Sequence, residues 1–328
     1  MFTSKPMDSP IAKAVLAPMH GPTIEIHLND HSELPAVVTR SRKPTHCVLT
    51  PQYMQSAERI RDLTVYEDDV WILSYPKCGT TWTQEMVWLV SHDLDYATAS
   101  EVNLLERSIF LEFSAFMLNF PGDTIKQVEE APRPRHIQCH LPLALLPKQI
   151  WTIRPRLIYC ARNPKDATVS FYHHYRHLHG YQGSMEDFLE AILADQVLFG
   201  PQIPHTLDFW TVRHEMNILF IHFEDMKMDM KSVLRRVCKY FGKSYSDDQL
   251  SELERHLSFD VMKNNKSANN SCVLELVEGL SGKKVEDFQF MRKGKIGSHH
   301  DELSPQYVSR LNQYIETHLA GSDFRFKE

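Results

Sequence analysis

The sequence predicts an α/β fold, a single domain in which a central parallel β-sheet is flanked by helices. Three observations support this prediction. Short apolar runs alternate with helical patterns from Asp69 onward, the order expected of a parallel sheet covered on both faces. A glycine-containing turn joins one apolar run directly to a helical pattern at residues 70–90. The chain has 328 residues, 42% of them hydrophobic, which suffices for a sizeable core.

The elements follow from the spacing of apolar side chains. Strands are expected at residues 70–74, 156–161 and 218–223. Helices are expected at residues 83–93, 165–177, 185–194, 231–241, 246–257 and 305–319. Polar or proline-rich stretches predict long loops at residues 120–135, 180–184 and 264–286. In a compact domain, such loops often form lids or the walls of binding sites.

The turn after the first expected strand predicts an anion-binding site. It reads Tyr-Pro-Lys-Cys-Gly-Thr-Thr-Trp at residues 75–82. The first backbone N–H groups of the following helix have no partner inside the helix and lie at its positive end. Lys77 adds a charge, and Thr80 and Thr81 add hydroxyl donors. The order differs from the phosphate loop of ATPases, in which the Lys follows the last Gly, because Lys77 precedes Gly79 here.

Composition and charge exclude several classes of protein. A net charge of −6 argues against binding to nucleic acid or to a membrane surface. No apolar run is long enough to span a bilayer, and the first 22 residues lack the pattern of a signal peptide. Six scattered cysteines favour reduced thiols, so we expect a cytoplasmic protein. His173 and His177 have a spacing that suits a metal, but no third ligand is evident and we predict no metal.

The turn at residues 76–82 resembles the 5′-phosphosulfate loop of the cytosolic sulfotransferases, in which a Ser usually stands in place of Cys78. The resemblance extends from about Asp69 to Phe326 and looks closest to the insect branch. It implies transfer of a sulfuryl group from 3′-phosphoadenosine 5′-phosphosulfate (PAPS), leaving 3′-phosphoadenosine 5′-phosphate (PAP). We expect a sulfotransferase domain at residues 46–328 after an N-terminal extension at 1–45. The loop residues assigned to the nucleotide are Lys77, Cys78, Gly79, Thr80, Thr81 and Trp82.

A second strand–turn–helix is expected to hold the 3′-phosphate. Arg162 ends a strand, Asn163 can cap the next helix, and Asp166 occupies the position of a reciprocal cap. A guanidinium group matches phosphate oxygens. The stretch from Arg162 to Ser170 resembles the second signature of the family, in which the Arg and the Ser bind the 3′-phosphate. Taken alone, this pattern also fits a capped surface helix with a solvated Arg.

Three further segments resemble parts of the family's nucleotide site. Arg292, Lys293 and Gly294 match a C-terminal Arg-Lys-Gly segment that wraps the 3′-phosphate. After Gly297 the chain departs from the family, and the residues that family dimers use nearby are absent. Trp82 corresponds to an adenine-stacking Trp. The other adenine contacts fall on Phe223, Leu257 and Phe259, and at Phe223 and Leu257 a family hydroxyl is missing.

The catalytic residues are assigned by the same resemblance. The segment at 138–142 resembles Lys-Thr-His-Leu-Pro, in which the His is the general base, so His140 takes that role. Lys77 is expected to stabilise the charge of the departing phosphate. Gln138 replaces a Lys that contacts the transferring sulfuryl group in the family. Because a neutral amide forms weaker bonds than an ammonium, we expect weaker catalysis or an unusual acceptor preference.

The sequence therefore predicts a PAPS-dependent sulfotransferase that acts on the hydroxyl, or the amine, of a small apolar acceptor such as a phenol, sterol or aliphatic alcohol. Two other functions stay open. A nucleotide kinase is one, since residues 219–225 could form a strand that ends in a magnesium-binding Asp. A PAPS-binding protein without catalysis is the other, given the changes at Gln138, Cys78 and Leu257. Elimination of the sulfated product, known in the insect branch, is a further variant.

Overall fold

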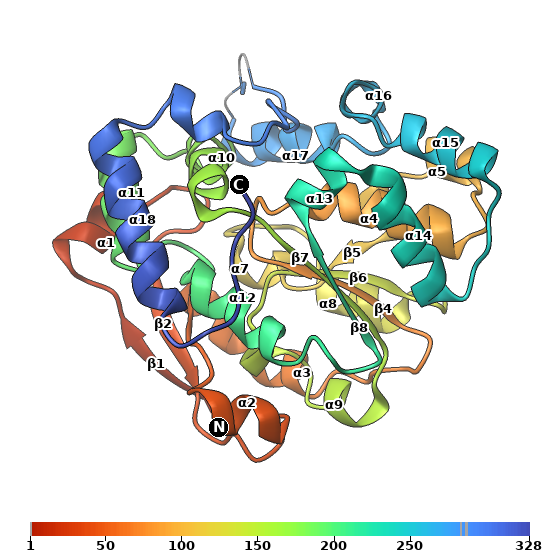
Figure 1. The fold of residues 1–328 in the computed structure, drawn as a ribbon. Coiled ribbons are helices and arrows are strands. Elements are labelled where there is room, and N and C mark those ends of the chain that lie inside the picture. The colour runs from red at the N-terminus through yellow and green to blue at the C-terminus, as the bar shows by residue number, and fades with distance from the viewer. Residues whose placement is uncertain (1, 283, 286–287) are drawn as a thin grey trace.

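Five parallel strands form the central sheet, in the order β5-β6-β4-β7-β8 (Figure 1). The structure is a computed structural model that describes residues 2–282, 284–285 and 288–328. The strands are β4 (Val70–Ser74), β5 (Ile109–Phe110), β6 (His136–Cys139), β7 (Arg156–Ala161) and β8 (Ile218–His222). This arrangement confirms the predicted α/β fold with its central parallel sheet.

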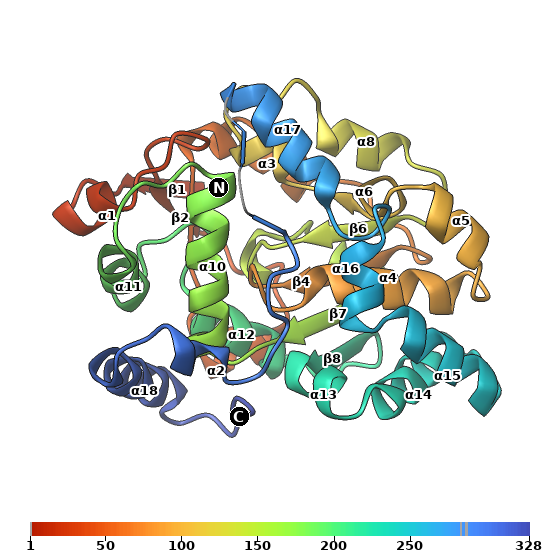
Figure 2. The same cartoon turned by 90° about the horizontal axis from the view of Figure 1, so that it is seen from above.

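Helices cover both faces of the sheet, because successive side chains of a strand point to opposite faces. In β4, Val70 and Ile72 join one hydrophobic cluster, and Trp71 and Leu73 join another. The first cluster packs under α4 (Thr80–Ser91), α14 (Met230–Phe241) and α15 (Asp247–His256). The second lies on the side of α10 (Pro164–Leu178), α11 (Met185–Leu193), α12 (Gln202–Thr211) and α18 (Pro305–Leu319) (Figures 1 and 2).

Shorter elements connect these layers. The remaining helices are α1 (Pro10–Ala14), α2 (Ala36–Ser41), α3 (Ala57–Arg61), α5 (Tyr96–Glu101), α6 (Leu104–Arg107), α7 (Phe113–Phe116), α8 (Thr124–Glu130), α9 (Ile150–Ile153), α13 (Phe223–Met228), α16 (Phe259–Asn264) and α17 (Ser271–Ser281). Single 3₁₀ turns lie at η1 (Pro51–Gln55), η2 (Leu143–Leu145) and η3 (Ser298–Asp301). No helix in the described parts of the chain is both long and apolar enough to cross a membrane.

Two of the expected long loops contain helices. The stretch at 120–135 includes α8. The Asp123 side chain caps the N-terminus of this helix by accepting a hydrogen bond from Lys126 N. The stretch at 264–286 includes α17, and its residues 283 and 286 lie outside the described residues. Both predictions were wrong for the same reason: short helices leave little periodicity in the sequence. The stretch at 180–184 is a loop, as expected.

The segment that was expected to be an N-terminal extension contains strands and helices of its own. Strands β1 (Phe2–Pro6), β2 (Ile24–Leu28) and β3 (Cys47–Leu49) form a separate antiparallel sheet. Buried side chains of residues 15–38 belong to the same hydrophobic cluster as the face of the central sheet under α10. Residues 2–45 therefore contribute to the core of the molecule (Figure 1).

The order of the strands creates a place for a ligand. The chain runs from β4 to β5 and β6 on one side and then crosses to β7 and β8 on the other. In open parallel sheets, ligands bind beyond the carboxyl ends of the strands where the chain changes direction in this way. Here that point lies between β6 and β7, at the end of β4.

Candidate active site

Four strand ends bring the predicted residues to one cavity. The turn at 75–79 follows β4, His140 follows β6, Arg162 follows β7 and Phe223 follows β8. One cavity is lined by nearly all of the predicted site residues: Lys77, Gly79, Thr80, Thr81, Trp82, His140, Arg162, Ser170, Phe223, Leu257, Phe259, Arg292, Lys293 and Gly294. Segments separated by more than 200 residues in the chain thus meet at the carboxyl edge of the sheet.

The turn after β4 has a backbone that few residues adopt. Lys77 and Gly79 have φ angles of 66° and 98°, in the left-handed region that disfavours side chains. Gly79 caps α4, and a Cβ atom there would lie 2.9 Å from Cδ2 of Phe223. The first hydrogen bond inside α4 runs from Thr83 N to Gly79 O. The N–H groups that precede Thr83 therefore have no partner inside the helix. The turn therefore supplies backbone donors at the start of α4.

Cys78 does not contact the cavity. Its side chain is buried, and its Sγ atom lies 3.8 Å from the carbonyl oxygen of Pro76. Its backbone N–H donates to the carbonyl oxygen of Tyr75. Cys78 is the one predicted nucleotide-binding residue that is not among the described residues lining the cavity, because the turn places it on its inner side. The replacement of a Ser by Cys78 consequently alters the packing under the turn rather than the cavity wall.

Lys77 is a half-buried amine, and no carboxylate is among its described partners. Its Nζ atom lies 3.4 Å from Nδ1 of His174 and 4.1 Å from the centre of the Phe290 ring. Burial, together with the nearby charges of Arg162 and Arg292, lowers the pKa of Lys77 to about 7. A half-buried amine without a carboxylate partner is prepared for an anion from outside the chain.

Arg162 is held beside this turn with part of its guanidinium unpaired. Its Nη1 donates to the carbonyl oxygen of Lys77 at 3.0 Å, and its guanidinium carbon lies 4.2 Å from the centre of the Phe223 ring. Its Nε atom is enclosed and has no hydrogen-bond partner. Ser170, on the first half of α10, is half-buried and lines the same cavity. An orphaned donor and a hydroxyl that belong to one cavity wall indicate a site for an oxyanion.

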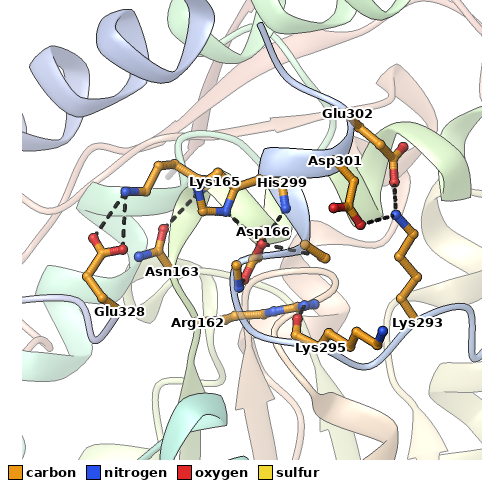
Figure 3. Close-up of polar contacts among 12 residues, drawn as sticks. Arg162, Asn163, Lys165, Asp166, Lys293, Lys295, His299, Asp301, Glu302 and Glu328 are labelled. Atoms are coloured by element: carbon orange, nitrogen blue, oxygen red, sulfur yellow. Dashed lines mark hydrogen bonds and ion pairs between the residues drawn. The ribbon is translucent and has the colours of Figure 1, made fainter. Parts of the chain in front are cut away.

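Asp166 does not form the expected reciprocal cap of α10. The side chain of Asn163 caps the helix by accepting from Lys165 N, whereas the carboxylate of Glu224 accepts the N–H of Asn163. Asp166 instead accepts from the backbone N–H groups of Gly297 and His299, as Figure 3 shows for His299. This contact ties the segment after Gly294 to the start of α10.

The cations at 292 and 293 have carboxylate partners. Arg292 Nη1 lies 2.6 Å from Glu302 Oε1. Lys293 Nζ lies 3.0 Å from Asp301 Oδ2 (Figure 3). Both cations still line the cavity. Gly294 has a φ of 57°, and a Cβ atom there would lie 2.4 Å from the ring of Phe259. Only glycine therefore allows this backbone to approach Phe259 so closely.

A set of aromatic rings lines the part of the cavity beside α4. Trp82 Nε1 donates to the carbonyl oxygen of Leu257 at 2.7 Å, which fixes the orientation of the indole. The rings of Trp82 and Phe223 meet edge to face with centres 5.7 Å apart. Phe259 completes this part of the wall. The arrangement offers flat apolar surfaces, as a purine base requires.

His140 is a neutral base whose tautomer is fixed by its neighbours. Its Nδ1 lies 2.7 Å from the carbonyl oxygen of Ser74, which accepts and therefore places the proton on Nδ1. Its Nε2 is left as an acceptor, and Gln138 Nε2 lies 3.2 Å from it. Burial lowers the pKa of His140 to about 3, so the ring is uncharged at neutral pH.

Gln138 is itself oriented by a second amide. Gln84, on α4, donates from Nε2 to Gln138 Oε1 at 3.0 Å and to Ser108 Oγ at 3.1 Å. This contact turns the nitrogen of Gln138 toward His140. The family has a Lys at the position of Gln138, whereas this chain has a neutral amide there, hydrogen-bonded to the amide of Gln84. Both amides are buried.

Sequence reasoning missed several residues of the cavity wall. They are Lys227, His174, His179, Asn270, Phe290 and Ser298. Helical spacing would have found two of them, because Lys227 lies four residues after Phe223 and His174 four after Ser170. The pair at His173 and His177 points elsewhere: His173 bonds to Glu302, and His177 stacks on Phe288.

Comparisons with known proteins agree with this geometry. Residues 67–323 match the family model described as the sulfotransferase domain. A luciferin sulfotransferase from Photinus pyralis is 33% identical over 289 residues, which cover 83% of this chain and 77% of that protein. Sulfotransferase 1 family member D1 from Mus musculus is 32% identical over 286 residues, 84% of this chain and 93% of that protein.

Solved structures show the same fold. A retinol dehydratase crystallised with androsterone and the inactive cofactor PAP aligns over 99% of this chain and 98% of its own, with a TM-score of 0.85 at 24% identity. A mouse sulfotransferase complexed with PAP aligns over 84% of this chain and 93% of its own, with a TM-score of 0.65 at 23% identity. From the family model and the sequence relatives together, the chain belongs to the sulfotransferase family of enzymes.

Proposed function

We propose that this enzyme transfers the sulfuryl group of PAPS to a hydroxyl group of a small apolar acceptor, such as a phenol, sterol or aliphatic alcohol. One observation carries the proposal: a single cavity joins Lys77 and Arg162, which have no carboxylate partner among the described residues, to the buried neutral imidazole of His140. The cations suit an anionic donor, and the imidazole suits removal of a hydroxyl proton. A cytoplasmic location is part of the proposal, and the six free cysteine thiols fit it.

The cavity residues fit a nucleotide with an anionic group at each end. Lys77 and the start of α4 would hold the phosphosulfate, because they offer a charge and free N–H groups. Arg162, Ser170 and the segment from Arg292 to Gly294 would hold the 3′-phosphate. The enclosed and unpaired Nε atom of Arg162 supports this fit, since a buried donor normally has a partner. Trp82, Phe223, Leu257 and Phe259 would surround the adenine.

The proposed reaction moves one proton and one sulfuryl group. The acceptor hydroxyl gives its proton to Nε2 of His140, and its oxygen forms a new bond to sulfur. The bond between sulfur and the bridging phosphate oxygen breaks, and the electron pair stays on the phosphate of PAP. Lys77 would stabilise that charge. Gln138 donates to the same Nε2 atom, so an acceptor hydroxyl has to share or replace this contact, which supports the expectation of slower catalysis.

The kinase alternative has less support from the structure. Asp225, the expected magnesium ligand, lies on α13 and forms ion pairs with Lys327 and Arg236. It is not among the described residues that line the cavity. A carboxylate that already has two cationic partners is poorly placed to hold a metal beside a nucleotide.

A transfer assay with ³⁵S-labelled PAPS tests the proposal. A phenol, a sterol and an aliphatic alcohol are offered as acceptors in the presence of EDTA. We expect label in the organic product and equimolar PAP, with no effect of the chelator. Label released as inorganic sulfate together with a dehydrated acceptor would identify the elimination variant. Tight PAP binding without transfer to any acceptor would favour a non-catalytic protein, and ATP-dependent phosphorylation abolished by EDTA would favour a kinase.

A further inference from the structure

The cavity continues beyond His140 into a second part whose wall is mostly apolar. Phe110 and Phe199 meet the His140 ring at centre distances of 5.0 and 5.5 Å. Phe116 follows, 5.2 Å from Phe199. Leu178 and Val277 add aliphatic surface to the same wall. A wall of this kind holds the flat apolar body of a ligand.

One polar side chain interrupts this apolar wall. His179 is only 3% exposed, and its ring stacks on Phe116 and on Tyr175 at centre distances of 6.5 and 4.7 Å. Its enclosed Nδ1 has no hydrogen-bond partner, and no described residue bonds to its Nε2. The His179 ring lines the cavity. The backbone carbonyl oxygen of His179 accepts a hydrogen bond from Met19 N.

An unpaired buried imidazole requires an explanation, because buried polar groups nearly always have a partner. Burial holds the pKa of His179 far below its ordinary value, so the ring is neutral and can both donate and accept. His174 lies beside it with ring centres 5.1 Å apart. The Nδ1 of His174 faces Lys77, and its other nitrogen has no described partner. A ligand that brings a hydroxyl group to this place would satisfy these atoms.

We infer that His179 forms a polar subsite for a second hydroxyl group of the acceptor, distinct from the hydroxyl that reacts at His140. The inference rests on the proposed function in that the acceptor occupies the cavity beyond His140. Phe199 and Phe116 lie in succession between the two imidazoles. The favoured acceptor is therefore a flat apolar molecule that carries a second hydroxyl group, a diphenol rather than a simple phenol.

The test compares 4,4′-dihydroxybiphenyl with 4-hydroxybiphenyl, which differ only in the second hydroxyl. Transfer from PAPS gives kcat/KM for each, and calorimetry with PAP present gives each Kd. After division by two for the two equivalent reactive hydroxyls, we expect the diphenol to be preferred roughly 3- to 10-fold, as one added hydrogen bond allows. In His179→Phe, which keeps the aromatic stacking, that preference should disappear.

His179→Gln and His177→Phe are the companion variants. The Gln side chain keeps a donor and an acceptor, so part of the preference should remain even if Phe disturbs the fold. His177 lies on the same helix but is not among the described residues lining the cavity, so His177→Phe should keep the full preference. Equal kcat/KM and Kd for both biphenols in the unmodified enzyme, or an unchanged preference in His179→Phe, would overturn the inference. No transfer to either biphenol, with the Kd preference intact, would count against the proposed function alone.

Discussion

The Nδ1 atom of His140 lies 2.7 Å from the backbone carbonyl oxygen of Ser74. The two residues are 66 positions apart, yet they meet because β4 and β6 are adjacent parallel strands that end side by side. The carbonyl oxygen can only accept, so it holds the proton on Nδ1 and keeps Nε2 as the basic atom. The sheet itself thus fixes the protonation state that a general base needs.

His140→Ala should abolish transfer while leaving the affinity for PAP nearly unchanged. Loss of a general base typically costs roughly 10²- to 10⁴-fold in kcat. His214→Ala is the matched control, because His214 is exposed. Steady-state assays with ³⁵S-PAPS and calorimetry with PAP measure the two effects. A loss of PAP affinity as large as the loss of kcat would show that His140 acts in nucleotide binding instead.

Arg162→Ala should weaken PAP binding far more than binding of AMP, which lacks the 3′-phosphate. Charge-assisted hydrogen bonds are worth about 1.5–3 kcal/mol, so we expect a loss of roughly 10- to 100-fold for PAP. Isothermal titration calorimetry with both nucleotides is the measurement. Arg235→Ala serves as the control, since Arg235 pairs with Asp247 on the exposed surface. Equal losses for PAP and AMP would remove Arg162 from the 3′-phosphate site.

Gly79→Ala should impair both folding and PAP binding, because the new Cβ would meet Phe223 at 2.9 Å in addition to the positive φ. Gly242→Ala separates the two effects: Gly242 also has a positive φ, but nothing lies within 4 Å of its Cβ position. We expect Gly242→Ala to lower stability by about 1 kcal/mol and to leave PAP affinity intact. Similar PAP affinities for the two variants would argue against a close approach at Gly79.

The affinity gained from Lys77 should fall as the pH rises from 6 to 8. An amine is charged below its pKa, and burial lowers the pKa of Lys77 to about 7 in the free enzyme. The phosphates of PAP also titrate in this range, so the useful quantity is the ratio of affinities between the unmodified enzyme and Lys77→Met. That ratio should decrease toward one above pH 7. A constant ratio across the range would show that Lys77 keeps its charge throughout.

Acid should destabilise the fold, because several buried histidines are neutral in it. Burial lowers the pKa of His20 and His205 to about 4 and that of His136 to about 3, as it does for His140. Unfolding therefore takes up protons between pH 6.5 and about 4, and stability falls as the pH falls through this window. Each ring contributes up to roughly 1.4 kcal/mol per pH unit.

The buried carboxyl groups of Glu112, Asp208 and Glu224 titrate in the opposite sense, because their pKa values are raised. Burial raises the pKa of Glu112 and of Asp208 to about 7, so each of them favours the folded state as the pH falls. The four histidines outnumber them, and the net effect remains a loss of stability in acid. Urea unfolding at pH 7 and at pH 5 measures it. Equal free energies of unfolding at both pH values would contradict the neutral state of these rings.

Much of the site could be predicted because its residues lie next to strand ends in recognisable local patterns. The turn at residues 75–82 and the capped start of α10 are read directly from adjacent residues. Helix α18 has the predicted bounds because Ser304 caps it before Pro305. Strands β5 and β6 were not predicted, because a strand of two to four residues is too short to show an alternating pattern of apolar residues.

What the sequence could not reveal depends on contacts between distant segments. Asp166 was read as a local cap, but its partners lie more than 130 residues away at Gly297 and His299. The position of Cys78 under the turn depends on the left-handed backbone of its neighbours Lys77 and Gly79. The amide pair of Gln84 and Gln138 bridges a helix and a strand. None of these contacts has a signature within a short stretch of sequence.

The most direct test is a crystal structure of the complex with PAP. The account predicts the 3′-phosphate within hydrogen-bonding distance of Arg162 and Ser170, the 5′-phosphate at Lys77 and the first N–H groups of α4, and the adenine between Trp82 and Phe223. A nucleotide bound outside this cavity, or bound in it with the two phosphates exchanged, would contradict the account.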